Sequence, residues 1–391
     1  MLFSQAQVIE DGRALALTFC GARVCQYHAL WLYDNAPTAS QRSLSNKQKL
    51  TTAATLPLDI IITSVQLDAV NGAVKIQFDN PKFEATFDQQ WLQDHAYAQA
   101  HATPPGWLPR PVHTWDQTLR NTIPTATFDS LCTDSDTLYE WLCAFNELGV
   151  ATVTQGPIRS GALLELVAQF GFVRETNYGK WFEVRSEAAP SNLAYTNVAL
   201  QAHTDNPYRD PTPTMQLLYC LQDAGEGGES VVIDGFHVAR VLRDEAPAHF
   251  ELLSSYCARF EYSGSTDVHL QARRPIIELA ADGELRAIRF NNRSIAPLVD
   301  VPYNLVPNYY RALKHFSEVV DRRSSAVRFK LLPGDAFMVD NTRVLHGRAE
   351  FSNTGARWLQ GCYPDLDGLR STIATMRRNA LPHSSTPRRS A

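Results

Sequence analysis

Short apolar runs fill the second half of this chain, and they constrain its fold more than any other feature. Between residues 182 and 363 the runs are four to six residues long, and turn-forming residues separate them. Such runs are typical of strands, and many short strands in succession predict a barrel or a jelly roll. One helix-like insert, at about 236–257, interrupts them. The predicted strands are 217–221, 230–233, 276–279, 285–290, 327–332, 336–339 and 358–363.

The length of the chain, 391 residues, exceeds what most single hydrophobic cores hold and predicts two domains. Residues 1–98 carry short alternating runs, and Asn71-Gly72 between two of them is a hairpin signal. Residues 99–125 contain five prolines, which interrupt regular structure, so this segment is predicted to be a linker. The second domain is then expected to span 126–376. The polar, basic segment 377–391 is expected to be disordered.

Two helices are predicted at the start of the second domain. Ser135 or Asp136 can cap the first, whose apolar residues recur at helical spacing until Gly149 ends it. The segment 159–170 repeats this pattern and is predicted to be the second helix.

The composition is that of an ordinary globular protein and excludes some classes of function. The net charge of -5 argues against a nucleic-acid or membrane-surface binder, since both usually present a basic surface. We find no apolar run of transmembrane length and no basic segment at the N-terminus of the secretory type. The seven cysteines are scattered and form no Cys-x-x-Cys pair. They are typical of reduced thiols, so a cytoplasmic protein is expected.

The motif His203-Thr204-Asp205, together with the distant His346, predicts a metal site. Two imidazoles and one carboxylate are the facial ligand set of non-haem Fe(II), which leaves positions open for substrate and oxygen. On a strand, His203 and Asp205 would face the same way. The alternative is a hydrogen-bonded structural pair. A second triplet, 249–251, lies in the predicted helical insert, where residues two apart diverge and cannot chelate.

Arg357 is the candidate for binding a cosubstrate. Iron of this kind needs a reductant beside the substrate, and in one large enzyme class this is the dicarboxylate 2-oxoglutarate. Its outer carboxylate needs a buried cation, and the guanidinium fork donates two parallel hydrogen bonds. Arg357 lies 11 residues after His346, at the start of a predicted strand. Arg343 and Arg348 are also close in sequence, and we interpret both as surface or inter-strand salt bridges.

Six segments of the second domain and a fainter one in the first carry a family resemblance. They are TNYGKWF at 176–182, NLAYT at 192–196, HTDNPY at 203–208, QLLYC at 216–220, DNTRVLHGR at 340–348, RWLQGCY at 357–363, and WLYDN at 31–35. Together they resemble γ-butyrobetaine hydroxylase and its relatives, which are Fe(II)/2-oxoglutarate dioxygenases. The resemblance implies a mainly β fold: a double-stranded β-helix (jelly roll) catalytic domain with flanking helices and a small N-terminal β domain. It also implies a homodimer, with O2 as oxidant and ascorbate as a stimulant.

The resemblance also implies substrate-binding residues. The family binds a quaternary ammonium in an aromatic cage, because a trimethylammonium group has no donors and ring faces attract it. The matching positions are Tyr178, Phe182, Tyr195 and Tyr363. For any one of these rings, packing in the core is the alternative. The acidic end of the substrate is expected to contact Asn192 and either Asn291 or Asn292.

Three departures from the family pattern affect these expectations. The N-terminal domain lacks the cysteines of the family's structural zinc at 35–41, and its histidine ligand is replaced near Lys82, so no structural zinc is expected. Asn206 follows the metal-binding Asp where a cage tyrosine often stands. Arg289 stands where a neutral residue is expected, two positions before Asn291.

Arg289 favours a phosphonate substrate. A phosphonate carries up to two charges and favours an arginine beside it, so 2-(trimethylammonio)ethylphosphonate is the predicted substrate and γ-butyrobetaine the alternative. The other reading of Arg289 is that it pairs with a nearby Glu or Asp. Two further classes stay open: an anion dioxygenase of sulfonate type without a cage, and a non-catalytic binding protein with a relic metal site.

Overall fold

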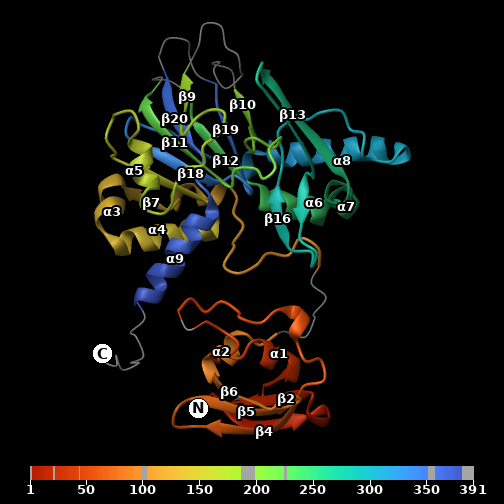
Figure 1. Cartoon of the computed structure of the whole chain (residues 1–391). Helices are drawn as coiled ribbons and strands as arrows, with labels where there is room; N and C mark the ends of the chain where they lie inside the picture. Colours follow the sequence, from red (N-terminus) through yellow and green to blue (C-terminus); the bar gives the residue numbers. More distant parts are fainter. Residues whose placement is uncertain are drawn as a thin grey trace. The chain divides into compact units, whose positions relative to one another are not determined.

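The computed structural model describes residues 2–20, 23–43, 45–97, 104–185, 199–223, 227–350 and 357–380. The chain divides into two compact units, residues 1–102 and 103–391, and each is described by itself (Figure 1). No helix in the described segments is both long and apolar enough to cross a bilayer.

The first unit consists of two three-stranded antiparallel sheets with an apolar core. One sheet contains β1 (Phe3–Ile9), β2 (Ala14–Phe19) and β3 (Val24–His28), and the other β4 (Ile61–Asp68), β5 (Ala73–Asp79) and β6 (Phe83–Asp88). Two short helices, α1 (Ala29–Asp34) and α2 (Gln89–Asp94), follow β3 and β6. The predicted hairpin is confirmed, because β4 pairs with β5 around Gly72, whose φ is +61°.

Two sheets packed face to face form the centre of the second unit. The six-stranded sheet has the order β7 (Thr125–Thr127), β8 (Val150–Thr154), β18 (Ala336–Asp340), β11 (Met215–Gln222), β20 (Trp358–Cys362) and β9 (Phe182–Arg185). The four-stranded sheet has the order β10 (Leu200–His203), β19 (Val344–Arg348), β12 (Ser230–Asp234) and β17 (Ala326–Phe329). Buried side chains of both, among them Phe337 and Val232, share one apolar cluster.

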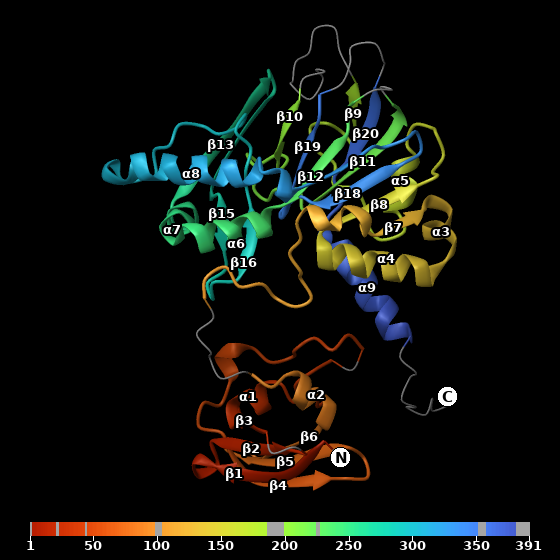
Figure 2. The ribbon, with the colours of Figure 1, turned by 180° about the vertical axis from the view of Figure 1, so that it is seen from behind.

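Helices cover the outer faces of the two sheets (Figures 1 and 2). Against the six-stranded sheet pack α3 (Phe128–Thr133), α4 (Ser135–Leu148) and α5 (Ala162–Val167), and α9 (Leu366–Ala380) contacts α4. The other side is built from α6 (Gly235–Glu245), α7 (Pro247–Ser255), α8 (Val306–Val320), and the hairpins β13 (Cys257–Ser265), β14 (Val268–Pro275) and β15 (Ile277–Leu279), β16 (Leu285–Ile288). The described 3-10 helices are η1 (Glu10–Gly12), η2 (Ala53–Thr55), η3 (Gln117–Asn121), η5 (Tyr303–Leu305) and η6 (Arg323–Ser325).

The predicted strands of the second unit are confirmed to within two or three residues, but some helical predictions are wrong. The insert at 236–257 is two helices, because Pro247 begins a new one. Helix α4 is capped by Asp134, whose side chain accepts from the Asp136 N–H, and not by Ser135 or Asp136. Gly149 ends it at φ +73°, as predicted. Residues 377–380, expected to be disordered, continue α9.

The described part of the predicted linker, from residue 104 onward, packs on the second unit. Trp115 is buried, and its backbone N–H donates to the Oδ2 of Asp234 over 3.0 Å. The same carboxylate pairs with Arg343 at 2.9 Å, and both side chains are fully buried. Arg343 therefore forms the inter-strand salt bridge that we predicted. Removing one partner of such a pair typically costs about 3–5 kcal/mol.

Candidate functional site

The sequence-predicted metal ligands lie together between the two sheets. His203 ends β10 and pairs in register with His346 in β19. The Nε2 atoms of these histidines lie 3.3 Å and 3.8 Å from the Oδ1 of Asp205. Ligand atoms about 2.1 Å from an octahedral ion lie about 3 Å from one another, so the spacing fits a metal ion. Among the described residues, His203, Asp205 and His346 form the one group of three His, Cys, Asp or Glu side chains whose ligand atoms lie close enough together to hold a metal ion.

Asp205 reaches this site for a reason other than the one predicted. Strand β10 ends at His203, so strand alternation does not orient the aspartate. Instead, its N–H donates to the Oδ1 of Asn341 over 2.7 Å, and the Nδ2 of Asn341 donates back to its carbonyl over 3.0 Å. The preceding Thr204 accepts the Phe290 N–H on its hydroxyl over 3.0 Å. Hydrogen bonds on both sides therefore fix the backbone that carries the carboxylate.

Thr204→Val should weaken both the fold and the metal site. Valine has the shape of threonine but leaves the buried Phe290 N–H without its acceptor, which costs about 1–3 kcal/mol in the free energy of unfolding. Loss of a group that orients metal ligands typically weakens metal binding about 10–100-fold. Denaturant titration and iron equilibrium dialysis measure the two effects. Thr204→Ser keeps the hydroxyl and is the matched control. A Thr204→Val protein with normal iron affinity would show that this hydrogen bond does not position Asp205.

The protonation states of Asp205 and His346 suit metal binding. Burial raises the pKa of Asp205, but its hydrogen bond with His203 and its electrostatic interaction with the two histidines outweigh this effect, so the pKa is lowered. Burial, with His203 and Arg293 nearby, lowers the pKa of His346 to about 3. The Nδ1 of His203 lies 2.8 Å from the carbonyl of Gln201, which leaves Nε2 for the ion. A carboxylate and neutral imidazoles are the ligand forms that metals need.

A cavity of about 90 Å³ joins the triad to Arg357. Arg348 also lines it and is buried, with 6 % of its surface exposed, so the interpretation of Arg348 as a surface residue is wrong. Burial, together with Arg357 and Arg293, lowers the pKa of Arg348 to about 10, so it is still a cation at neutral pH. A cavity lined by both metal ligands and arginines fits a dicarboxylate that chelates the ion, such as 2-oxoglutarate.

Aromatic side chains gather beside the triad. The ring centroids of Tyr178 and Phe182 are 6.3 Å apart, and those of Phe182 and Tyr363 are 5.1 Å apart. Tyr262 lies 6.2 Å from Tyr178 and 5.1 Å from Tyr208. We call these five rings the aromatic wall. Three of them were expected from the sequence, whereas Tyr208 and Tyr262 were not. Tyr262 comes from the distant strand β13, so no signal in the sequence indicated its place beside Tyr178 and Tyr208.

Hydroxyl groups link the aromatic wall to the triad. Tyr363 donates to the Oδ2 of Asp205 over 2.8 Å, and Tyr208 donates to the Oδ1 of Asn206 over 2.6 Å. The hydroxyls of Tyr178 and Tyr208 lie 3.2 Å apart. Burial raises the pKa of Tyr208 to about 12 and also raises those of Tyr178 and Tyr363. Tyr178, Tyr208 and Tyr363 are therefore neutral phenols at physiological pH.

Arg289 was expected to reach the substrate site beside the triad, but its side chain has other partners. Its Nη1 donates to the carbonyls of Pro207 and Arg209 over 3.2 Å and 3.0 Å, and its Nε lies 3.8 Å from Glu278. The alternative reading, pairing with a nearby acidic residue, is therefore the better one. The arginine braces the loop that follows Asp205.

The predicted asparagines differ in where they point. The Nδ2 of Asn291 donates to the carbonyl of Thr204 over 3.4 Å, and Asn292 donates to Gln201 over 2.9 Å from an exposed position. Asn206 is buried, and its Nδ2 has no hydrogen-bond acceptor in the described part of the chain. Two more predicted residues, Asn192 and Tyr195, lie outside the described residues.

Arg293 is a site residue that sequence reasoning missed. Its Nη2 lies 2.9 Å from the Nε2 of His203, although the residue as a whole is solvent-exposed. The signal in the sequence was a third polar side chain directly after Asn291 and Asn292. The turn at these residues, closed by Ser294 N–H donating to the Asn291 carbonyl over 3.1 Å, decides which of them faces the metal ligands.

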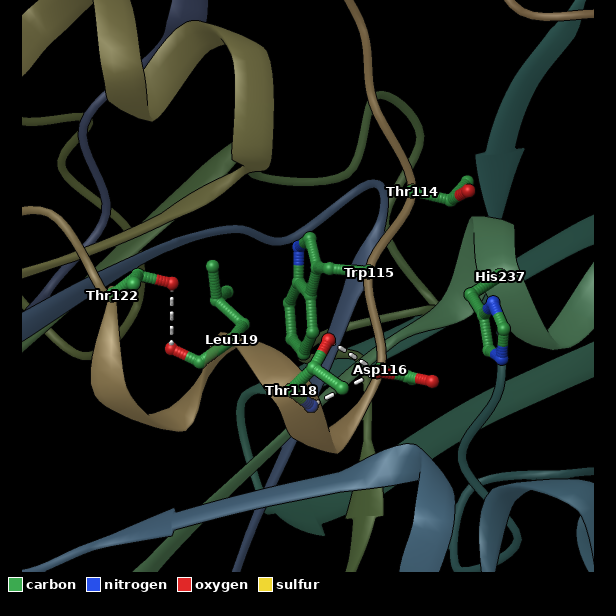
Figure 3. A pocket seen from close by; sticks show the side chains of 7 residues that line it. All are labelled: Thr114, Trp115, Asp116, Thr118, Leu119, Thr122 and His237. Atoms are coloured by element: carbon green, nitrogen blue, oxygen red, sulfur yellow. Dashed lines mark hydrogen bonds between the residues drawn. The ribbon is translucent and has the colours of Figure 1, made fainter.

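A second cavity, of about 310 Å³, has different chemistry (Figure 3). It is lined by Thr114, Trp115, Asp116, Thr118, Leu119, Thr122 and His237. The Oδ1 of Asp116 accepts from the Thr118 N–H over 2.9 Å and from its hydroxyl over 2.7 Å, and these bonds lower the pKa of Asp116. The carboxylate therefore caps η3, and the cavity contains none of the triad.

Comparison with known proteins agrees with this geometry. Residues 111–363 match the family described as "Taurine catabolism dioxygenase TauD, TfdA family". The chain is 35% identical over 368 residues to the γ-butyrobetaine dioxygenase of Pseudomonas sp. (strain AK-1), covering 93% of this chain and 94% of that one. It is 30% identical over 380 residues to the human γ-butyrobetaine dioxygenase, covering 96% and 97%. It is 29% identical over 356 residues to human mitochondrial trimethyllysine dioxygenase, covering 89% and 82%.

The matched region contains the triad, Arg357 and the aromatic wall, and the relatives extend through the first unit as well. Two histidines and a carboxylate within ligand distance, joined by a cavity to two arginines, are what such an enzyme requires. The chain therefore belongs to the TauD/TfdA family of Fe(II)- and 2-oxoglutarate-dependent dioxygenases, in the branch that includes the γ-butyrobetaine dioxygenases.

Proposed function

We propose that this enzyme hydroxylates a small trimethylammonium compound with an acidic tail, and that γ-butyrobetaine is its substrate. The observation that carries this proposal is the contact of the aromatic wall with the triad, through the hydroxyl of Tyr363 on Asp205. A ring that is hydrogen-bonded to a metal ligand would hold a quaternary nitrogen close to the metal site. Each such ring face contributes roughly 0.5–2 kcal/mol to binding. The names of the relatives support the same class of substrate.

The side chains divide the work of this reaction. Iron and 2-oxoglutarate, when bound, supply the activation of O2 for C–H hydroxylation. His203, Asp205 and His346 would hold the ion on one face, and Arg357 would bind the outer carboxylate of 2-oxoglutarate. The aromatic wall would hold the substrate nitrogen and exclude water from the carbon that reacts. Holding the reacting atoms together in this way accounts for a large part of enzymatic rate enhancement.

The phosphonate that we expected first becomes the second candidate. That expectation rested on Arg289, which donates to backbone carbonyls and lies beside Glu278. The relatives cited above are named for γ-butyrobetaine and trimethyllysine. γ-Butyrobetaine therefore takes the place of 2-(trimethylammonio)ethylphosphonate as the proposed substrate.

The test is substrate turnover by the purified full chain with Fe(II), 2-oxoglutarate and ascorbate, following both succinate and the hydroxylated product. We expect γ-butyrobetaine to exceed 4-aminobutyrate in kcat/KM by at least about tenfold, since one ring contact alone is worth up to about 2 kcal/mol. Equal use of a sulfonate without a quaternary nitrogen would favour an anion dioxygenase. Absence of product with every candidate would favour a non-catalytic binding protein.

We further infer from the resemblance that the two facing sheets form a double-stranded β-helix and that the enzyme is a cytoplasmic homodimer. The face-to-face packing of the six- and four-stranded sheets supports the first inference. Size-exclusion chromatography with light scattering would test the dimer.

A further inference from the structure

We propose that Arg293 binds the acidic tail of the substrate and is the residue that sets tail specificity. This inference rests on the proposed trimethylammonium substrate. It assigns a role to a residue that neither the sequence motifs nor the asparagines expected at the tail had indicated.

The position of Arg293 carries the first step. Its Nη2 lies 2.9 Å from the Nε2 of His203, the atom that faces the metal site. When the ion takes this nitrogen, the guanidinium must move aside, but its backbone is held in place. The Arg293 N–H donates to the Oδ1 of Asn291 over 3.2 Å, and Asn291 itself donates to the carbonyl of Thr204. The guanidinium of Arg293 therefore stays within one side-chain length of the metal site.

The second step concerns charge. The charges at the ion balance, because Asp205 and the chelating carboxylate of 2-oxoglutarate together match the two positive charges of a divalent ion. The other carboxylate of the cosubstrate is expected at Arg357 and Arg348, which line the same cavity. An anionic group of the substrate is therefore the group that would neutralise Arg293. Arg293 is solvent-exposed, so a ligand can reach it.

The third step concerns geometry. Arg293 contacts His203, whereas Tyr363 of the aromatic wall contacts Asp205. These contacts involve two neighbouring metal ligands: the Nε2 of His203 lies 3.3 Å from the Oδ1 of Asp205, and Tyr363 donates to the other oxygen, Oδ2. A short zwitterion with its nitrogen against the wall and its acid on Arg293 would therefore lie beside both ligands. The carbons between its two charged ends are then the ones presented for hydroxylation.

The chemistry of the guanidinium suits this role. Its fork donates two parallel hydrogen bonds and so matches a carboxylate, and it also suits a phosphonate, which has three acceptor oxygens. Asn206 belongs to the other end of the site, because its Oδ1 accepts from the hydroxyl of Tyr208 in the aromatic wall over 2.6 Å.

The experiment compares wild type, Arg293→Ala and Arg293→Lys with three substrates. These are γ-butyrobetaine, 2-(trimethylammonio)ethylphosphonate, and butyltrimethylammonium, which has the same nitrogen but no acid. For Arg293→Ala we expect kcat/KM to fall at least about tenfold with the carboxylate, as for the loss of a charged hydrogen bond, and further with the phosphonate. The tailless compound should be used equally by wild type and Arg293→Ala. Arg293→Lys should recover part of the loss, because it keeps the charge without the fork.

Arg286→Ala is the control, because Arg286 is exposed in β16 and pairs with Glu284. Iron content and the KM for 2-oxoglutarate are measured for each variant. The proposal is overturned if Arg293→Ala keeps wild-type kcat/KM with both acids. It is also overturned if the KM for 2-oxoglutarate rises instead, which would assign Arg293 to the cosubstrate. If wild type hydroxylates no trimethylammonium compound, the proposed function fails as well, and that result is independent of the variants.

Discussion

Asp205→Ala is expected to lose its iron and to reduce turnover by at least about 100-fold. Two histidines alone do not complete a facial site. Even the loss of a residue that only hydrogen-bonds to a metal ligand typically lowers metal affinity or activity about 10–100-fold. The loss of the carboxylate also removes the acceptor for Tyr363 and Gln216, so the ring beside the metal loses its anchor. Elemental analysis after reconstitution measures iron per chain, and succinate release measures turnover.

Asp210→Ala is the matched control for this change. Asp210 lies five residues further on, is exposed, and pairs with Arg274 at 2.7 Å. This variant should keep iron and activity. An Asp205→Ala protein with a full complement of iron and a normal rate would remove Asp205 from the triad, and the two histidines would then need another partner.

Arg357→Ala is expected to raise the KM for 2-oxoglutarate by at least about thirtyfold and to leave iron in place. Removing one member of a desolvated charge pair typically costs about 2–5 kcal/mol, and 1.4 kcal/mol is a tenfold change. Arg357 lines the cavity and is buried enough that desolvation lowers its pKa, so water does not easily replace its hydrogen bonds to the carboxylate. Steady-state kinetics with varied 2-oxoglutarate gives the number.

Arg348 supplies the comparison, because it lines the same cavity and is also buried. Arg357→Lys should show an intermediate KM, since lysine keeps the charge but not the two parallel bonds. If Arg357→Ala changes the KM by less than about tenfold while Arg348→Ala changes it more, the roles of the two arginines are exchanged.

The local part of this protein could be predicted from its sequence. Strand periodicity and turn residues depend on neighbours in the chain, so β11, β12, β18 and β20 were found within two or three residues, and Gly149 marked the end of α4. The triad was also predicted, because His203-Thr204-Asp205 and His346 offer the facial ligand set and the family motifs around them favoured a metal site over a hydrogen-bonded pair. Strand and turn predictions needed only local chemistry and spacing, whereas the triad needed the resemblance as well.

Only the tertiary structure decided which side chains face the metal. Arg289 and Arg293 are four residues apart and equally charged, yet the first bonds to backbone carbonyls and the second reaches His203. Arg348 became a cavity residue because β19 lies inside its sheet, between β10 and β12. Tyr262 joined the aromatic wall from β13, more than 80 residues beyond Tyr178. Such placements arise from the pairing of distant strands and from turn geometry, and residue type and spacing along the chain do not determine them.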